Sequence, residues 1–327
     1  MFGKINVGIM GAGKIAGVMA GTVNKMNSVK CYAVASRTKE KAEAFGAAYG
    51  IKKCYGSYEE MLQDKKVDLV YIATPHSEHC ENAKLCISYG KPVLCEKAFT
   101  ANAAQAKEVL EYAKEKDVLV AEAIWTRYMP MYQTIREVLD SGVIGEVRMV
   151  SANLGYAIEG VERLTNPALA GGALLDLGVY PLNFAAMILG TDLVRMDSSC
   201  DMLPTGVDRQ ESITLHYKNG AMAVLHCSMS VVSDRMGGIY GTRGYAVVEN
   251  INNFQSMTVY NDKHEKLSVY KAPRQISGYE YEVEACVKAI REGWKQCPQM
   301  PHSEILRMME LMDTLRGQWG VKYPFEA

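Results

Sequence analysis

The stretch Ile5-Asn6-Val7-Gly8-Ile9-Met10-Gly11-Ala12-Gly13-Lys14-Ile15-Ala16 decides the fold of this chain. An apolar run typical of a strand leads into a glycine turn, and the turn opens a helix. The spacing Gly11-x-Gly13-x-x-Ala16 suits the pyrophosphate of a dinucleotide, because the first glycine permits the tight turn and the second lets the backbone approach the phosphates. Free N–H groups at the helix N-terminus then face the anion. The stretch predicts a Rossmann-type nucleotide-binding domain.

The same letters fit a second phosphate-binding pattern. Gly8 to Lys14 reads as GxxxxGK, the start of a P-loop. A P-loop continues with Ser or Thr to bind magnesium, and the next residue here is Ile15. A plain glycine turn is the remaining alternative. The dinucleotide fold is preferred because a strand precedes the glycines and a helix follows them.

The end of the second predicted strand, residues 31–35, indicates which dinucleotide is bound. NAD-binding chains place an Asp or Glu here to bind the ribose 2′-hydroxyl. This chain has Ser36-Arg37-Thr38, followed by Lys39 and Lys41. A hydroxyl and a guanidinium suit a 2′-phosphate, so the segment favours NADP and leaves NAD open. A solvated, charged start of a helix is the alternative interpretation.

Composition bounds the class of protein. The chain has 327 residues, 48% of them hydrophobic, and a formal net charge of −1. This length suits two domains, and the charge gives no electrostatic case for a nucleic-acid or membrane partner. We expect no transmembrane helix and no signal peptide, because the first apolar run is a strand. Nine scattered cysteines without a CxxC pair favour a reducing, cytoplasmic location. His76, His79 and Cys80 lack further ligands at a familiar spacing, so no metal is expected.

The first part of the chain alternates strands and helices. Apolar runs predict strands at 5–10, 32–36, 69–73, 92–96 and 119–123, and the spacing of apolar residues predicts a helix at 101–116. Buried strands separated by helices indicate a doubly wound parallel sheet. Ligands bind such sheets at the carboxyl ends of the strands, so the loops after Met10, Ser36, Ala73, Glu96 and Ala123 should carry the site.

The pattern changes near residue 146. Alternating runs predict strands at 147–154, 211–217, 221–230, 245–249 and 257–260, with helices at 181–189, 279–292 and 303–317. We therefore expect an α/β chain with a Rossmann domain at 1–123 and an α+β domain at 124–327. The second domain should contain a large, open, mostly antiparallel sheet. An open sheet needs cover on its free face, and a homodimer through this sheet is the expected partner arrangement.

Three local clusters should converge on the predicted site. The first is Ala73-Thr74-Pro75-His76-Ser77-Glu78-His79, which follows a strand and can line the nucleotide; a helix capped by Ser77 is the alternative. The second is Glu96-Lys97 at a strand end, where an unpaired charge would be costly without a ligand or a partner charge; a surface salt bridge is the alternative. The third is the glycine-led run 171–181, in which Asp176 and Tyr180 are four residues apart and share a helix face. A purely structural Tyr–Asp hydrogen bond would give the same pattern.

Together these motifs resemble the Gfo/Idh/MocA oxidoreductase family over nearly the whole chain. The resemblance rests on GxGxxA, Ala73-Thr74-Pro75 with His79, residues 90–97 (GKPVLCEK) and residues 171–178 (GGALLDLG). The chain departs from the family twice: Glu-Lys-Pro reads Glu-Lys-Ala, and DxGxH has Tyr180 in place of His. With residues 121–130 (AEAIWTRYMP), this resembles the branch that contains dimeric dihydrodiol dehydrogenase and NADP-linked D-xylose dehydrogenases.

The resemblance implies a function and roles for residues. It implies hydride transfer between NADP and a secondary alcohol or carbonyl of a sugar or diol, with Tyr180 as acid/base, Lys97 as its electrostatic partner and Asp176 orienting the substrate or the lysine. Substrate contacts are expected from Lys97, Trp125, Asp176, Tyr180 and Tyr279. Cofactor contacts are expected from Gly11, Gly13, Lys14, Ile15, Ser36, Arg37, Thr38, Thr74, Pro75, His76, His79, Glu96, Lys97, Trp125 and Arg127. A glycoside or inositol-type polyol as substrate, and a non-catalytic NADP-binding sensor, remain alternatives.

Overall fold

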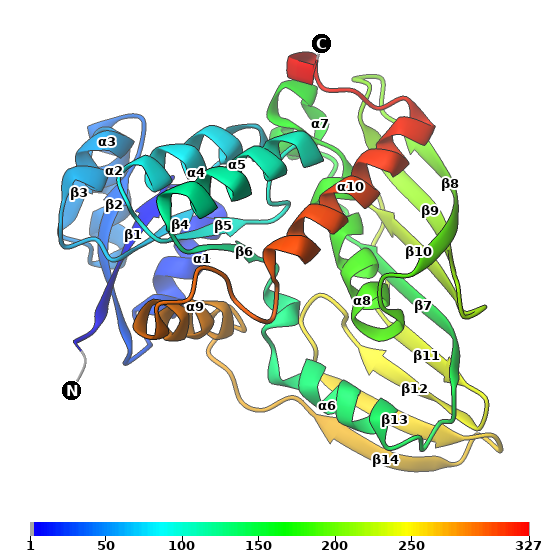
Figure 1. The fold of residues 1–327 in the computed structure, drawn as a ribbon. Coiled ribbons are helices and arrows are strands. Elements are labelled where there is room, and N and C mark those ends of the chain that lie inside the picture. The colour runs from blue at the N-terminus through cyan, green and yellow to red at the C-terminus, as the bar shows by residue number, and fades with distance from the viewer. Residues whose placement is uncertain (1–2, 327) are drawn as a thin grey trace. The chain divides into compact units, whose positions relative to one another are not determined.

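The fold is described from a computed structural model, which covers residues 3–326. The chain divides into two compact units (Figure 1). Within the described residues, unit 1 contains residues 3–125 and 275–310, and unit 2 contains residues 126–274 and 311–326. The first boundary lies close to the expected one at residue 123. Residues 275–310, however, pack with the first unit instead of the second.

Unit 1 is built on a six-stranded parallel sheet in the order β3-β2-β1-β4-β5-β6. The strands are β1 (Ile5–Met10), β2 (Val29–Ala35), β3 (Lys53–Tyr55), β4 (Leu69–Ile72), β5 (Val93–Glu96) and β6 (Val120–Ala123). The order reverses between β1 and β4, and the loops at this switch point form the crevice in which doubly wound sheets bind ligands. The predicted parallel, doubly wound sheet is confirmed.

Helices cover both faces of this sheet. They are α1 (Lys14–Val23), α2 (Lys39–Tyr49), α3 (Tyr58–Gln63), α4 (His79–Ser88), α5 (Ala103–Lys116) and α9 (Glu280–Glu292). Figure 1 shows α4 and α5 along one face and α1 and α9 along the other. Helix α9 buries Val283, Cys286 and Val287, which recur at helical spacing. Its apolar stripe explains why this late segment belongs to the first unit.

Unit 2 is built on an eight-stranded sheet in the order β14-β13-β12-β11-β7-β10-β9-β8. The strands are β7 (Val147–Gly155), β8 (Leu193–Met202), β9 (Asp208–Tyr217), β10 (Met222–Ser228), β11 (Gly237–Gly241), β12 (Gly244–Glu249), β13 (Ser256–Asn261) and β14 (Lys266–Lys271). All neighbouring strands run antiparallel except β7 and β10, which are parallel. The expected open, mostly antiparallel sheet is confirmed.

The helices of unit 2 include one irregular segment. They are α6 (Pro130–Asp140), α7 (Glu162–Thr165), the π-helix η4 (Leu174–Gly178) and α8 (Val179–Leu189). Helix α10 (His302–Trp319) begins in unit 1 and ends in unit 2. Residues 167–189 are long and apolar enough to cross a membrane, but 94% of their most apolar window is buried inside the protein. Their position in the core of the fold accounts for this composition.

Candidate functional site

The glycine turn between β1 and α1 has the geometry that a dinucleotide pyrophosphate requires. Gly11 has φ +103°, and a Cβ there would lie 2.9 Å from the carbonyl oxygen of Ala73. Gly13 caps α1 without a side-chain hydrogen bond, and a Cβ added to it would meet no atom within 4 Å. Helix α1 begins at Lys14. The backbone N–H groups of its first turn, which includes Lys14 and Ile15, therefore remain available to bind an anion. The backbone here fits a nucleotide phosphate.

The loop after β2 carries a cation without a carboxylate partner. Arg37 is exposed, and no described residue forms a hydrogen bond or ion pair with it. Ser36 is buried, and Thr38 caps α2 by accepting a hydrogen bond from the Lys41 amide at 3.3 Å. The Thr38 hydroxyl thus has a structural role already. The chain offers a 2′-phosphate a guanidinium here, and residues 36–38 include no acid.

The loop after β4 is tied to the loop after β5 by two histidines. The His76 ring lies 3.1 Å from the Lys97 carbonyl oxygen. The nitrogens of His79 each lie 2.9 Å from a carbonyl oxygen, one of Ala98 and one of Thr74. Burial lowers the pKa of His79, so the neutral ring donates to only one of these oxygens. Because His79 is only 1% exposed, its side chain is not accessible to a cofactor. Its contribution to cofactor binding would be indirect, by holding these two loops in place.

Ser77 and Pro75 lie in the same loop. Ser77 does not cap helix α4: the capping position is Glu78, without a side-chain hydrogen bond. The Ser77 hydroxyl is instead buried and has no partner. Pro75 precedes the short helix η1 (His76–Glu78), and the Thr74 hydroxyl accepts a hydrogen bond from Asn82 at 3.0 Å. A buried hydroxyl without a partner in the loop after β4 is a group that a ligand can satisfy.

Two charged residues with different surroundings, Glu96 and Lys97, lie at the end of strand β5 and directly after it. Glu96 is buried and accepts a hydrogen bond from the Tyr71 hydroxyl. Lys97 is half-buried, its amide donates to Glu96 at 3.2 Å, and its peptide bond to Ala98 is cis. The interpretation that one of the two side chains faces the interior holds for Glu96.

Two further buried carboxyls, neither of them predicted from the sequence, lie near Glu96. Glu122 in β6 accepts a hydrogen bond from the Phe99 amide at 3.1 Å. Glu282 in α9 is fully buried, and neither of its oxygens has a partner. Burial, then the charge of Glu96, raises the pKa of Glu282 well above its ordinary value. The sequence does contain a sign of this buried acid. Glu282 and Cys286 are four residues apart and therefore lie on the same, apolar face of α9.

Trp125 and Tyr279 form an aromatic wall within unit 1. Their rings stack at 4.0 Å between centroids with 16° between planes. Trp125 is 6% exposed, and its indole N–H has no hydrogen-bond partner. Tyr279 caps helix α9. The sequence places the two residues 154 positions apart, and the fold brings them together.

Unit 2 carries the other predicted residues. Tyr180, the second residue of α8, is 5% exposed. Asp176, in the π-helix, forms an ion pair with Arg163, whose Nη1 lies 3.0 Å from Oδ1. The Arg127 Nε donates to Asn183 at 2.5 Å, which ties this arginine to α8. Arg163 was not predicted, because nothing in the sequence relates it to Asp176 thirteen residues later.

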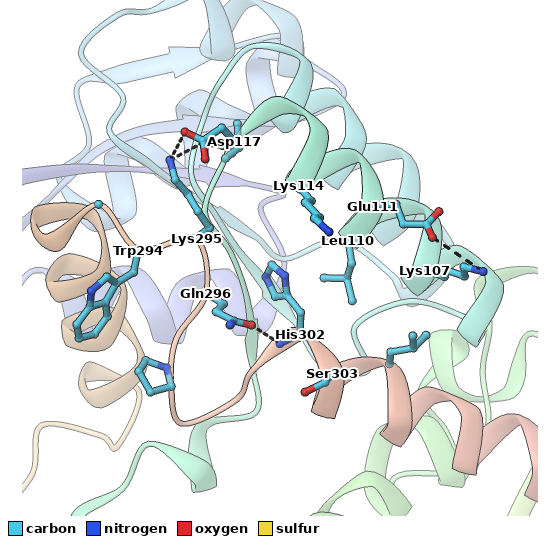
Figure 2. Close-up of a pocket in the computed structure, with 14 residues that line it drawn as sticks. Lys107, Leu110, Glu111, Lys114, Asp117, Trp294, Lys295, Gln296, His302 and Ser303 are labelled. Atoms are coloured by element: carbon cyan, nitrogen blue, oxygen red, sulfur yellow. Dashed lines mark hydrogen bonds and ion pairs between the residues drawn. The ribbon is translucent and has the colours of Figure 1, made fainter.

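A separate cavity of about 790 Å³ lies in unit 1 between α5 and the segment after α9 (Figure 2). Lys295 pairs with Asp117 at its rim, and the Gln296 side chain accepts a hydrogen bond from the His302 amide. None of the predicted cofactor or substrate residues lines this cavity. Within residues 3–326, no group of three or more His, Cys, Asp or Glu side chains could hold a metal ion.

Comparisons with known proteins agree with this geometry. A family model described as "Oxidoreductase family, NAD-binding Rossmann fold" matches residues 5–124, and one for the GFO/IDH/MocA C-terminal domain matches residues 132–247. The trans-1,2-dihydrobenzene-1,2-diol dehydrogenase of Mus musculus is 33% identical over 97% of both chains. The human enzyme of that name is 32% identical over 89% of both.

This chain belongs to the Gfo/Idh/MocA oxidoreductase family. It is a nicotinamide-dependent dehydrogenase, as its relatives of this family are. Among solved structures, KijD10, a 3-ketoreductase from Actinomadura kijaniata in complex with NADP and TDP-benzene, matches with a TM-score of 0.86 and 26% identity. That match covers 96% of this chain and 98% of the other. An aldose-aldose oxidoreductase from Caulobacter crescentus has the same fold, with a TM-score of 0.87, 22% identity, and coverage of 96% and 97%.

Proposed function

We propose that this protein is an NADP-dependent oxidoreductase acting on a secondary alcohol or carbonyl of a sugar or diol, such as D-xylose or a trans-dihydrodiol. The observation that carries the proposal is the pair Asp176 and Tyr180, two buried polar side chains in the otherwise apolar segment 174–180. The names of the relatives, which are dihydrodiol dehydrogenases, support the substrate class.

The preference for NADP rests on the loop after β2. A 2′-phosphate carries negative charge that an acid would repel, and this loop presents Ser36 and the unpaired guanidinium of Arg37. KijD10, a neighbour in fold, was crystallised with NADP. Arg37 in this proposal binds the 2′-phosphate, and the glycine turn binds the pyrophosphate.

Each residue of the site has a separate task in this proposal. The nicotinamide, when bound, supplies the acceptor or donor of hydride at its C4. Tyr180 takes the proton of the substrate hydroxyl during oxidation and returns it during reduction. An ordinary phenol has a pKa near 10, so a nearby ammonium is needed for it to act as a base at neutral pH, and we assign that role to Lys97. Asp176, held by Arg163, orients the substrate.

The partner arrangement we propose is a homodimer through the open sheet of unit 2. One face of this sheet presents stacked tyrosines: Tyr245 lies 4.8 Å from Tyr260 and 6.3 Å from Tyr240 between ring centroids. Val224, on the central strand β10, is 40% exposed. An apolar face of this kind favours a protein partner.

The cellular location that we propose is the cytoplasm. The nine cysteines are free and mostly buried, which is typical of proteins in a reducing compartment.

The experiment that tests the function is a spectrophotometric assay with the purified protein. NADP⁺ or NAD⁺ is added with a panel of aldoses, polyols and trans-1,2-dihydrobenzene-1,2-diol, and formation of the reduced cofactor is followed. Turnover of a sugar or diol with NADP⁺ supports the proposal. Tight NADPH binding without turnover of any member of the panel would favour a sensor.

A further inference from the structure

Two buried carboxyls in unit 2 have no part in the reaction described above. Asp208 and Glu211, both in β9, are 0% and 4% exposed. Residues three apart on a strand ordinarily face opposite sides of the sheet. Here the pairing shifts from Met202↔Asp208 to Asp201↔Gln210, so Arg209 is an extra residue in β9. This bulge turns both carboxyls to the covered face of the sheet.

Asp208 lies against the start of the segment that carries Asp176. Its Oδ2 accepts a hydrogen bond from the Leu174 amide at 2.5 Å. Gly172 has φ +121°, and a Cβ there would lie 2.3 Å from Oδ1 of Asp208. The Tyr323 hydroxyl donates to the Gly171 carbonyl oxygen at 2.8 Å. The double-glycine turn is thus held by a side chain on each side, and the first amide of the π-helix is held by Asp208.

Glu211 lies against the other end of the same π-helix. Its Oε1 accepts a hydrogen bond from the Cys227 thiol at 2.6 Å. A Cβ on Gly178 would lie 2.8 Å from that oxygen. The residues from Leu174 to Gly178 therefore contact one carboxyl at each end, and Tyr180 lies two residues after Gly178. A π-turn inside a helix is rare and occurs often at functional sites. Side chains that hold this π-helix in place would therefore also hold the functional residues that it carries.

We infer that Asp208 is a positioning residue for the reaction: by holding the Leu174 amide, it sets the π-helix that presents Asp176 and Tyr180. The inference rests on the proposed role of Tyr180. A carboxylate accepts a hydrogen bond from an amide more strongly than a neutral carboxyl does, so the support depends on the charge of Asp208. A displacement of about 1 Å at the reacting group can lower turnover about 10²-fold.

The charge of Asp208 changes in an accessible pH range. Burial raises its pKa to about 6, and the hydrogen bond from Leu174 opposes the rise. The titratable and charged groups that face it come from several elements: Glu211 in β9, Cys200 in β8, Cys227 in β10, Arg316 in α10, and Tyr323. Asp208 is thus ionised at neutral pH and becomes protonated as the pH falls through about 6. The support of the π-helix should weaken over the same range.

The test compares Asp208→Asn and Asp208→Ala with the wild type and with Asp197→Asn, an exposed carboxyl of β8. Hydrogen exchange of the 171–180 peptide is measured from pH 5 to 8, and kcat for D-xylose or trans-1,2-dihydrobenzene-1,2-diol is measured with NADP⁺. In the wild type and in Asp197→Asn, we expect the protection of these amides, calculated after correction for the intrinsic exchange rate at each pH, to decrease and kcat to fall as the pH drops below about 6. In Asp208→Asn, both pH dependences should disappear, with NADPH affinity unchanged. Asp208→Ala should lose about 10²-fold in kcat, and Asn should restore part of that loss.

The outcomes separate the inference from the proposed function. If the protection of the 171–180 amides and kcat still decrease below pH 6 in Asp208→Asn, the proposed role of Asp208 is wrong. Full turnover in Tyr180→Phe would overturn the role of Tyr180, and hydrogen exchange alone would then decide whether Asp208 holds the turn. Unchanged kcat in both the Asn and the Ala variant, with NADPH binding intact, would show that neither the charge nor the hydrogen bond of Asp208 matters for the reaction.

Discussion

At the scale of single residues, the hydroxyl of Tyr180 and the ammonium of Lys97 are the groups that substitution tests most directly. Tyr180→Phe removes only the hydroxyl from a buried ring, and Lys97→Met keeps much of the side-chain length without the charge. Each variant should lose roughly 10²–10⁴-fold in kcat and retain NADPH binding, because acid/base catalysis contributes about that much. Steady-state rates and NADPH fluorescence titration measure the two effects. Near-normal rates in both variants would contradict the assignment.

Arg37 is the residue on which the choice of cofactor depends. Arg37→Ala should weaken NADP binding at least tenfold more than NAD binding, because only NADP has the 2′-phosphate that the guanidinium would pair with. Titration with both reduced cofactors gives the two Kd values. Lys52→Ala, another exposed cation of unit 1, serves as the control and should change neither. An equal loss for both cofactors in Arg37→Ala would place the arginine away from the 2′-phosphate.

At the scale of elements, α9 carries the clearest consequence for stability. Glu282 is buried on its apolar face without a hydrogen-bond partner, and its pKa is raised by burial and by the charge of Glu96. The folded protein therefore holds a proton that the unfolded chain releases above pH about 4.3. As the pH rises above that value, the wild type should lose up to about 1.4 kcal/mol of its free energy of unfolding per pH unit, until the folded group itself ionises.

Glu282→Gln removes this titration. The gain in stability of the variant over the wild type should increase with pH between about 5 and 8, as measured by urea unfolding. Glu292→Gln, at the exposed end of α9, is the matched control and should show no such trend. A difference between Glu282→Gln and the wild type that stays constant across this range would mean that Glu282 is ionised in the folded protein.

Some strands could be predicted from the sequence pattern and others could not. The strands at 5–10, 69–73 and 92–96 were predicted closely, because they are apolar runs buried on both faces. Strands β3, β8, β11 and β14 were missed for different reasons. β3 has three residues, and β11 contains three glycines. No residue of β8 or β14 is fully buried, and both strands mix polar and apolar side chains without a clear alternation. The π-helix was expected to be an ordinary helix, since its residues have no distinct periodicity.

At the scale of the whole molecule, the free face of the unit 2 sheet gives a prediction about assembly. Val224→Glu places a charge in the middle of this face and should convert a dimer to a monomer, because a buried charge without a partner is costly. Analytical ultracentrifugation measures the change. Val143→Glu is the matched control, since Val143 is also 40% exposed but lies in the turn after α6. A wild type that sediments as a monomer at micromolar concentration would refute the dimer.

The sequence by itself determined the nucleotide-binding fold and the residue types of the candidate site. Those features depend on neighbours along the chain: an apolar run, a glycine turn, and a helix start. Only the tertiary structure decided that residues 275–310 belong to the first unit, that Arg163 pairs with Asp176, and that Asp208 holds the turn before Asp176. These are contacts between residues separated along the chain, and they depend on a bulge and on burial that no local pattern records.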